Sequence, residues 1–187
     1  MCEQENPCRA FFEAHENNLK KVEALWEEAG RFDWESLSAS MHSPGPVGDD
    51  EELARVVISP IHIDAESGEI KPAFLSDVKN KGGSSDRLAH GSVGDAITRS
   101  AAIQTVKNAS SATPDRLRAV QGIARFNAKR LRLLNTSSGT QAFGIYDTGR
   151  EDNKGHADIC QLVADEKEAR SARWDLLMLT REGFQRA

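Results

Sequence analysis

The chain has 187 residues, of which 39% are hydrophobic and 28% charged, and its formal net charge is -5 at pH 7. This composition is that of a folded domain and excludes the class of disordered, highly charged chains. The negative charge excludes attraction of the whole surface to nucleic acid or anionic lipid, so any such binding must be local. The sequence has no recognisable signal peptide, membrane-spanning run or paired-cysteine motif, so we expect a cytoplasmic protein with no metal, no other cofactor and no membrane partner.

Residues 1–35 predict a helical arm. Asn6-Pro7 is typical of a helix start and Gly30 of a helix end, which gives one long helix of about 22 residues. Apolar residues recur along it at spacings of three and four, the pattern of a helix that packs lengthwise on another helix. We therefore expect this helix to bind another protein or a second copy of the chain. The expected contact residues are Phe12, Leu19, Val22 and Trp26.

Residues 36–51 are rich in Ser, Pro and Gly and have no hydrophobic period, which predicts a linker. A compact domain is then expected over residues 52–187. It begins with a strand over residues 53–58, where a run of β-branched side chains favours extended structure. A shorter strand over residues 61–64 and an apolar segment over residues 70–75 follow, separated by a polar turn.

The rest of the domain alternates helices and strands. Ser92 and Asp95 form a capping-box pattern that starts a helix running to residue 108. Thr113-Pro114-Asp115 resembles another helix start, and residues 117–131 keep a helical period. Residues 142–146 and 157–163 indicate two antiparallel or neighbouring strands, and Asp165 begins a last helix. The predicted fold is thus α/β of the α+β kind: a compact mixed or antiparallel sheet with flanking helices, preceded by a long N-terminal helix.

One cluster suggests phosphate binding. Residues 81–87 combine paired glycines, two hydroxyl groups and a guanidinium group, and such a loop could hold a phosphate. The segment lacks the residue order of a P-loop, and a plain surface turn is the alternative. The candidate phosphate-binding residues are Gly82, Gly83, Ser84 and Ser85.

A second cluster suggests proton transfer. His156 and Asp158 enter a predicted strand, and their spacing of two places both side chains on the same face. A histidine beside a carboxylate can act as a general acid or base. The alternatives are that His156 caps a strand end and that His62 lies on a solvated strand face. The candidate catalytic residues are His156, Asp158, Arg87 and His62.

A basic stripe suggests contact with nucleic acid. Several cations would lie on one side of the helix expected from residue 117 onward, where they could bind a phosphate backbone. Only Phe126 offers an aromatic platform nearby, and solvated helix faces commonly carry such stripes. The candidate residues are Arg118, Arg125, Lys129 and Arg132, with Arg116 and Arg130 nearby.

From Arg55 onward the chain resembles a family of small uncharacterised bacterial proteins with three spaced blocks: an early strand and turn, a Gly-Ser-x-x-Arg block and a late His-Ala block. The resemblance implies a strand over residues 123–126 followed by a short helix, in place of a continuous helix, and it implies no activity. Lys154-Gly155 stands where the family has a proline-containing pair. The matching segments are Ser59-Pro60-Ile61-His62 running to Ala73-Phe74, then Gly83 to Arg87, then Asn153 to Ile159.

Three functions remain open from the sequence. The first is an interaction or accessory subunit of a bacterial protein complex, docked through the N-terminal helix. The second is an enzyme that processes a nucleotide or nucleic acid, in which the candidate catalytic and phosphate-binding residues converge. The third is a nucleic-acid-binding module that uses the basic stripe, and the acidic balance of the chain disfavours it.

Overall fold

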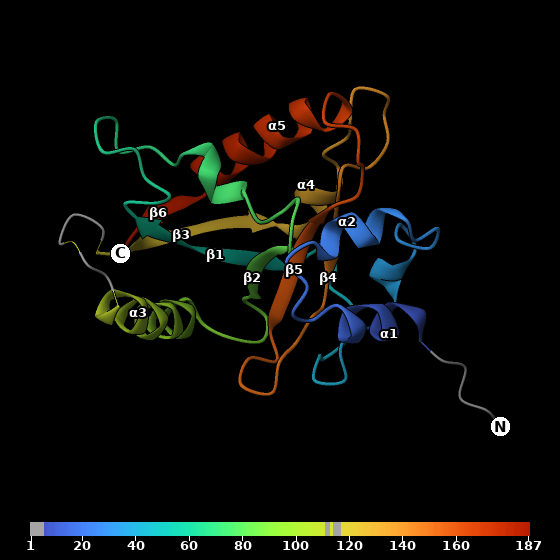
Figure 1. Ribbon diagram of the computed structural model, residues 1–187, viewed down its shortest axis with the longest axis horizontal. Coiled ribbons are helices and arrows are strands. Elements are labelled where there is room, and N and C mark those ends of the chain that lie inside the picture. Colours follow the sequence, from blue (N-terminus) through green and yellow to red (C-terminus); the bar gives the residue numbers. More distant parts are fainter. Residues whose placement is uncertain (1–5, 111–112, 114–116) are drawn as a thin grey trace.

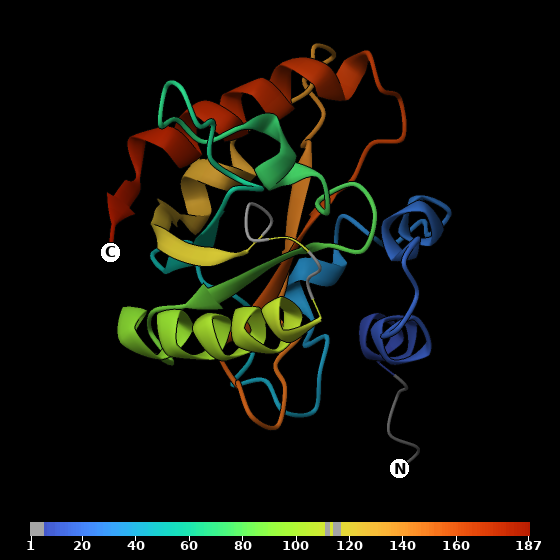
Figure 2. The ribbon, with the colours of Figure 1, turned by 60° about the vertical axis from the view of Figure 1, so that its left-hand side comes forward.

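The computed structural model describes residues 6–110, 113 and 117–187. The elements in chain order are α1 (Pro7–Ala14), α2 (Lys21–Trp26), the 3-10 turn η1 (Trp34–Ser36), β1 (Glu52–Ser59), the 3-10 turn η2 (Pro72–Leu75), β2 (Gly83–Arg87), α3 (Val93–Ala109), β3 (Ala119–Asn127), α4 (Ala128–Arg132), β4 (Phe143–Tyr146), β5 (His156–Gln161), α5 (Glu168–Glu182) and β6 (Phe184–Arg186). The strands form one antiparallel sheet in the order β4-β5-β2-β1-β3-β6. Helices flank the sheet, with α5 on one face and α3 on the other (Figures 1 and 2). The predicted α/β fold with flanking helices is confirmed, and of the two kinds of sheet left open, mixed or antiparallel, the sheet is antiparallel.

The face of the sheet under α5 holds the main hydrophobic core. Leu53 and Val57 of β1 pack there with Phe126 of β3, Ile159 of β5 and Leu176 of α5. Burying each such side chain contributes roughly 1.5–3 kcal/mol. The burial also fixes the strand register, because a slip of one residue would turn these side chains to the opposite face.

Two separate helical units cover the opposite face. α3 packs on β1 and β3 through Ala54, Ala96 and Ile123. α1 and α2 lie at the other end of the sheet, over β4 and β5, around Tyr146 and Cys160 (Figure 1). Between α3 and the α1–α2 unit, β2 and β5 present polar side chains, and the candidate site lies there.

Five predicted elements are confirmed with shifts of a few residues at their ends. β1 spans the β-branched run, and β4 pairs with β5 in antiparallel register. The Ser92 hydroxyl accepts a hydrogen bond from the Asp95 amide, and the Asp95 carboxylate accepts one from the Ser92 amide, so the capping box forms at the start of α3. Asp165 accepts hydrogen bonds from the amides of Lys167, the N-cap residue of α5, and of Glu168, its first residue, so α5 begins a few residues after Asp165.

The prediction of one long N-terminal helix is wrong. α1 ends at Ala14, and α2 begins only at Lys21. The turn between them carries Asn18, whose side chain accepts a hydrogen bond from the Lys20 amide. Asparagine side chains compete with helical hydrogen bonds in this way, so the polar turn outweighs the apolar period that runs across it.

The continuous helix predicted from residue 117 is also wrong. Strand β3 and the short helix α4 occupy this segment, in agreement with the strand and helix that the family resemblance implies. Gly122 explains the difference: its φ is +154°, and a Cβ there would lie 2.1 Å from the Gln185 carbonyl oxygen, so the glycine lets β6 approach. Of the helix start expected at residues 113–115, Pro114 and Asp115 lie outside the described residues.

Three further segments differ from expectation. Residues 61–64 form no strand and contribute only a single bridge, between Ile63 and Ile70, and residues 72–75 are a 3-10 turn. The Gly-Ser segment for which a surface turn is the alternative expectation is the central strand β2.

Among the described helices, none has both the length and the apolar character needed to cross a membrane.

Candidate functional site

A groove of about 540 Å³ runs between α3 and the middle strands of the sheet, and we call it the α3 groove. Its volume lies in the range of pockets that bind small molecules. Ser84 of β2 and His156 of β5 contribute to its lining, as does His62 from the segment after β1. With Arg118 of the expected basic stripe, four of the residues singled out from the sequence therefore share one concave surface.

The central feature of the α3 groove is a hydrogen bond of 2.6 Å between the Ser84 Oγ and the His156 Nε2. The antiparallel register places Ser84 opposite Asp158 and Asp86 opposite His156, so all four side chains share one face of the sheet. Ser84 is exposed, whereas His156 is buried. A serine held by a histidine at this distance is the arrangement of an activated nucleophile.

The surroundings of His156 fix which ring nitrogen carries the proton. Its Nδ1 lies 3.1 Å from the Thr148 carbonyl oxygen, which can only accept a hydrogen bond, and 2.9 Å from the Thr148 hydroxyl. Nδ1 is therefore assigned as the donor, which leaves Nε2 free to accept the Ser84 proton. Burial lowers the pKa of His156, although the Asp158 carboxylate opposes the shift. The neutral ring required of a base is thus the favoured form.

Asp158 supplies a negative charge beside this pair. Its Oδ1 lies 3.9 Å from the His156 Nε2, and its Oδ2 accepts a hydrogen bond of 2.6 Å from the Lys21 ammonium group. Burial alone would raise the pKa of Asp158, but Lys21 and then His156 hold it below its ordinary value. The carboxylate is therefore charged and placed to stabilise a protonated His156. Because it faces Nε2, on the side of Ser84, the geometry differs from a Ser-His-Asp triad, in which the carboxylate holds Nδ1.

Six cationic side chains line the α3 groove, and they are Arg55, Lys81, Arg99, Lys107, Arg118 and Arg150. Two of them are paired, Arg55 with Asp77 and Arg99 with Asp86. Lys81 and Arg150 are exposed and make no ion pair with any carboxylate among the residues that the structure describes. This concentration of positive charge, in a chain of net charge -5, favours an anionic ligand.

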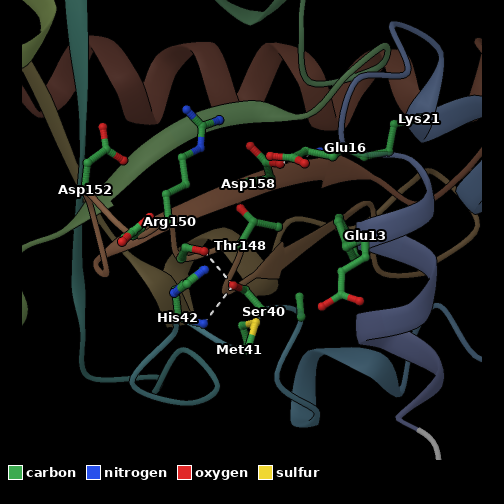
Figure 3. Close-up of a pocket in the computed structure, with 14 residues that line it drawn as sticks. Glu13, Glu16, Lys21, Ser40, Met41, His42, Thr148, Arg150, Asp152 and Asp158 are labelled. Atoms are coloured by element: carbon green, nitrogen blue, oxygen red, sulfur yellow. Dashed lines mark hydrogen bonds and ion pairs between the residues drawn. The ribbon is translucent and has the colours of Figure 1, made fainter.

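Asp158 and Arg150 also line a second pocket, of about 460 Å³, between the sheet and α1. Figure 3 shows the carboxylates of Glu13 and Glu16 on one side of this pocket and His42 on the other. Its lining mixes carboxylates and cations. Within the described residues no group of three His, Cys, Asp or Glu side chains has an arrangement that could hold a metal ion.

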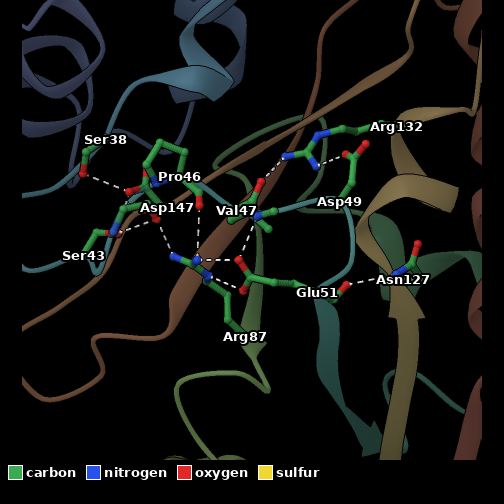
Figure 4. Close-up of polar contacts among 12 residues, drawn as sticks. Ser38, Ser43, Pro46, Val47, Asp49, Glu51, Arg87, Asn127, Arg132 and Asp147 are labelled. Atoms are coloured by element: carbon green, nitrogen blue, oxygen red, sulfur yellow. Dashed lines mark hydrogen bonds and ion pairs between the residues drawn. The ribbon is translucent and has the colours of Figure 1, made fainter.

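Arg87, the fourth candidate catalytic residue, lies on the other face of β2 and does not line the α3 groove. Its guanidinium group binds both carboxylate oxygens of Glu51 and donates to the carbonyls of Gly45 and Pro46 (Figure 4). Arg87 is 2% exposed. It therefore fixes the segment before β1, residues 36–51, against the sheet.

The predicted linker is held at a second point by Asp147. The Asp147 carboxylate accepts hydrogen bonds from the Ser38 and Ser43 hydroxyls and from the Ala39 amide (Figure 4). Asp147 is itself buried. Residues 36–51 thus cross the sheet edge as a strap with defined partners at both ends.

The candidate phosphate-binding residues separate into two groups. Only Ser84 lines the α3 groove. Ser85 is buried and donates to the Ala157 carbonyl oxygen. Gly82 has a φ of +91°, and a Cβ on Gly83 would lie 2.2 Å from the Arg55 Nη1. These glycines therefore satisfy requirements of backbone conformation and packing.

The expected partner-binding residues of the arm lie mostly against the chain's own sheet. Phe12 and Val22 are buried in the cluster that includes Tyr146. The Trp26 indole donates to the Gln161 carbonyl oxygen at 2.9 Å. Leu19, in the turn between α1 and α2, is 74% exposed.

The residues of the predicted basic stripe do not form a stripe. Arg118 lines the α3 groove, while Arg125 lies on strand β3. Arg132 of α4 binds Glu35 and Asp49, and Lys129 is exposed on α4. Arg116 lies outside the described residues.

Sequence reasoning missed Lys21, Thr148 and Arg150. Lys21 and Thr148 lie 137 and 8 residues from the side chains that they contact, and no local motif links Lys21 to Asp158. A faint signal was present for Arg150, which stands in the polar turn just before the His156 block.

No family model matches the chain, and no curated protein and no solved structure is significantly similar to it. The resemblance to the bacterial family described above therefore stays a prediction.

Proposed function

We propose that the chain is an enzyme that binds a phosphate-bearing small molecule of nucleotide size in the α3 groove and uses Ser84 as a nucleophile. The observation that carries the proposal is the 2.6 Å hydrogen bond from the Ser84 hydroxyl to the unprotonated Nε2 of a buried histidine. The cations around this pair support a phosphate-bearing substrate, since they would offset the charge on its oxygens.

Each residue around Ser84 has its own role in the proposed phosphoryl transfer. When the Ser84 oxygen bonds to the phosphorus, its proton passes to the His156 Nε2, and the bond from phosphorus to the leaving group breaks. His156 then delivers that proton to the leaving group. Asp158, 3.9 Å from Nε2, stabilises the imidazolium form between the two transfers. Lys81 and Arg150 are the cations available to the phosphoryl oxygens.

The first experiment tests the nucleophile with a fluorophosphonate, which reacts with activated serine hydroxyls. Ser84 should carry the adduct in a mass-spectrometric peptide map, and Ser84→Ala and His156→Ala should abolish labelling. Ser171→Ala, at an exposed serine on α5, and heat-denatured protein are the controls. Labelling of Ser84 that persists in His156→Ala would contradict the proposal, as would no labelling in the native protein.

The second experiment tests the anion site by calorimetry with inorganic phosphate and with adenosine monophosphate. The double variant Lys81→Ala/Arg150→Ala should weaken binding about tenfold or more, because each cation in such a site contributes roughly 1 kcal/mol or more. Lys129→Ala/Arg186→Ala removes the same charges from exposed positions outside the α3 groove and should leave affinity unchanged. Equal affinities of the two double variants would contradict the assignment.

Docking on a partner through the N-terminal helices has less support. Its support in the sequence is the apolar period of residues 1–35, but Phe12 and Val22 of that period are buried within the chain itself. Leu19 alone among the expected contact residues is mainly exposed. Sedimentation of the wild type and of Leu19→Asp tests this proposal, since a partner or second copy bound there would be lost in the variant.

A further inference from the structure

A second groove lies on the far side of the molecule, between η2 and the outer surface of α5, and we call it the α5 groove. Its volume is about 700 Å³. The buried side chains of Leu75 and Leu177 line it, together with Trp174. Trp174 is 57% exposed, which is unusual for so large an apolar ring. Exposed aromatic rings at the edge of a groove are typical anchors of protein interfaces.

The charged residues that line the α5 groove are all cations: Lys79, Lys167, Arg170 and Arg173. Glu166 pairs with both Lys79 and Arg173 and partly neutralises them. Lys167 and Arg170 form no ion pair with a carboxylate in the part of the chain that the structure describes. An apolar groove edged by unpaired cations, in an acidic chain, is complementary to a ligand that is both apolar and negatively charged.

The helix sets the spacing of these groups. Lys167, Arg170 and Trp174 follow one another at intervals of three and four, so they lie along one stripe of α5. The stripe is about 10 Å long at 1.5 Å per residue. On the same scale Arg170 and Trp174 lie about 6 Å apart, and two extended residues of a peptide span nearly the same length at about 3.3 Å each, with their side chains on the same side. A carboxylate and a bulky side chain two residues apart in a peptide would therefore meet Arg170 and the indole at the same time.

We propose that the α5 groove binds an acidic peptide segment of a partner protein, with a bulky apolar side chain inserted beside Trp174 and a carboxylate of the same segment on Lys167 or Arg170. The hydroxyls of Ser76, Ser137 and Ser171 line the same groove and can bind the peptide backbone. The site is independent of the proposed Ser84 chemistry, because α3, whose residues line the α3 groove, and α5 lie on opposite faces of the sheet (Figure 2).

Selection of a displayed library of random peptides against the folded chain tests the proposal. Enriched peptides should combine Asp or Glu with an aromatic or large aliphatic residue two positions away. Fluorescence polarisation with the best peptide should show affinity that falls as the NaCl concentration rises. Trp174→Ala and the double variant Lys167→Glu/Arg170→Glu should each weaken binding about tenfold or more. All three positions are exposed, so these variants are expected to fold, and circular dichroism checks that they do.

Lys129→Glu/Lys154→Glu makes the same charge change at exposed positions outside the α5 groove and should bind the peptide like the wild type. The proposal is overturned if no peptide is enriched, if the enriched peptides carry no acidic residues, or if binding is unaffected by Trp174→Ala. Self-association that disappears in Trp174→Ala would also overturn it, since a second copy of the chain would then be the occupant.

Discussion

The Lys21 ammonium group lies 2.6 Å from the Asp158 carboxylate, and both side chains are more than nine-tenths buried, at 7% and 6% exposure. Burial alone would lower the pKa of Lys21, but Asp158 holds it above its ordinary value, and Asp158 stays ionised. The contact joins α2 to strand β5. It fastens the N-terminal arm to the strand that carries His156.

Replacing Lys21 with methionine should destabilise the protein strongly. The substitution keeps the apolar stem but leaves the Asp158 carboxylate buried without its cation, which typically costs 3–5 kcal/mol, so we expect about that loss in the free energy of unfolding. Chemical denaturation monitored by circular dichroism measures it. Lys20→Met is the matched control, because Lys20 is 74% exposed and pairs only with a surface glutamate. Equal stabilities of the two variants would show that the buried pair is not needed for folding.

A substitution at Arg87 distinguishes a structural role, in which Arg87 holds residues 36–51 against the sheet, from a catalytic role. Arg87→Lys keeps the charge but removes the fork that binds both Glu51 oxygens and the two carbonyls, so it should destabilise the protein by about 2 kcal/mol or more. It should also speed proteolysis within residues 36–51. Arg130→Lys alters a similar bidentate contact with Glu182 at the surface and should change the free energy of unfolding little. Fluorophosphonate labelling of Ser84 should be retained in the folded Arg87→Lys variant. Loss of labelling would mean that Arg87 contributes to the reactivity of Ser84.

Gly83→Ala tests the packing explanation of the paired glycines. The added methyl group would lie 2.2 Å from the Arg55 Nη1 and 2.7 Å from the Val78 Cγ2, so both side chains must move. Overpacking of this kind typically costs 1–3 kcal/mol, and we expect a loss of about that size in thermal and chemical unfolding. Gly91→Ala is the control, since a Cβ there meets nothing within 4 Å. A stable Gly83→Ala variant with impaired phosphate binding would instead favour a direct role in the site.

The sequence predicted best where one local signal dominates. The β-branched run of β1, the capping box of α3 and the strand pair around His156 all follow from short patterns and appear in the structure. The same-face placement of His156 and Asp158 follows from strand geometry alone. The side-chain chemistry of His62 and Ser84 marks both as candidates in the sequence, and the fold brings both to the α3 groove.

The failures have identifiable physical causes. The apolar period of the arm runs on through the polar turn at Asn18, and the period from residue 117 continues across Gly122, so in both segments a periodic pattern hid a break. β2 looked like a turn because glycine and serine have weak strand propensity, yet its neighbours β1 and β5 supply its hydrogen bonds. Lys21 could not be assigned, because its partner is distant in the sequence.

The last prediction concerns the part of the pH dependence of stability that is due to His62. Its Nδ1 accepts a hydrogen bond from the Ile58 amide, and its ring meets Phe74 edge to face. Burial, reinforced by the nearby Arg55 charge, lowers the pKa of His62 from 6.5 to about 4. Between these pH values the unfolded chain binds a proton that the native chain excludes. The contribution of the uncharged His62 to the free energy of unfolding is therefore fully present above pH 6.5 and is lost as the pH falls toward 4.

His62→Asn should remove this dependence, since an asparagine oxygen can still accept from the Ile58 amide but does not titrate. The stability advantage of the wild type over the variant should shrink by about 1–2 kcal/mol between pH 7 and pH 4, after allowance for the part of the ring that solvent reaches. Urea unfolding at a series of pH values measures the difference, in which the titration of the carboxylates common to both proteins cancels. An advantage that stays constant across this range would mean that His62 takes up its proton in the native state, and a charged His62 would then join the cations of the α3 groove.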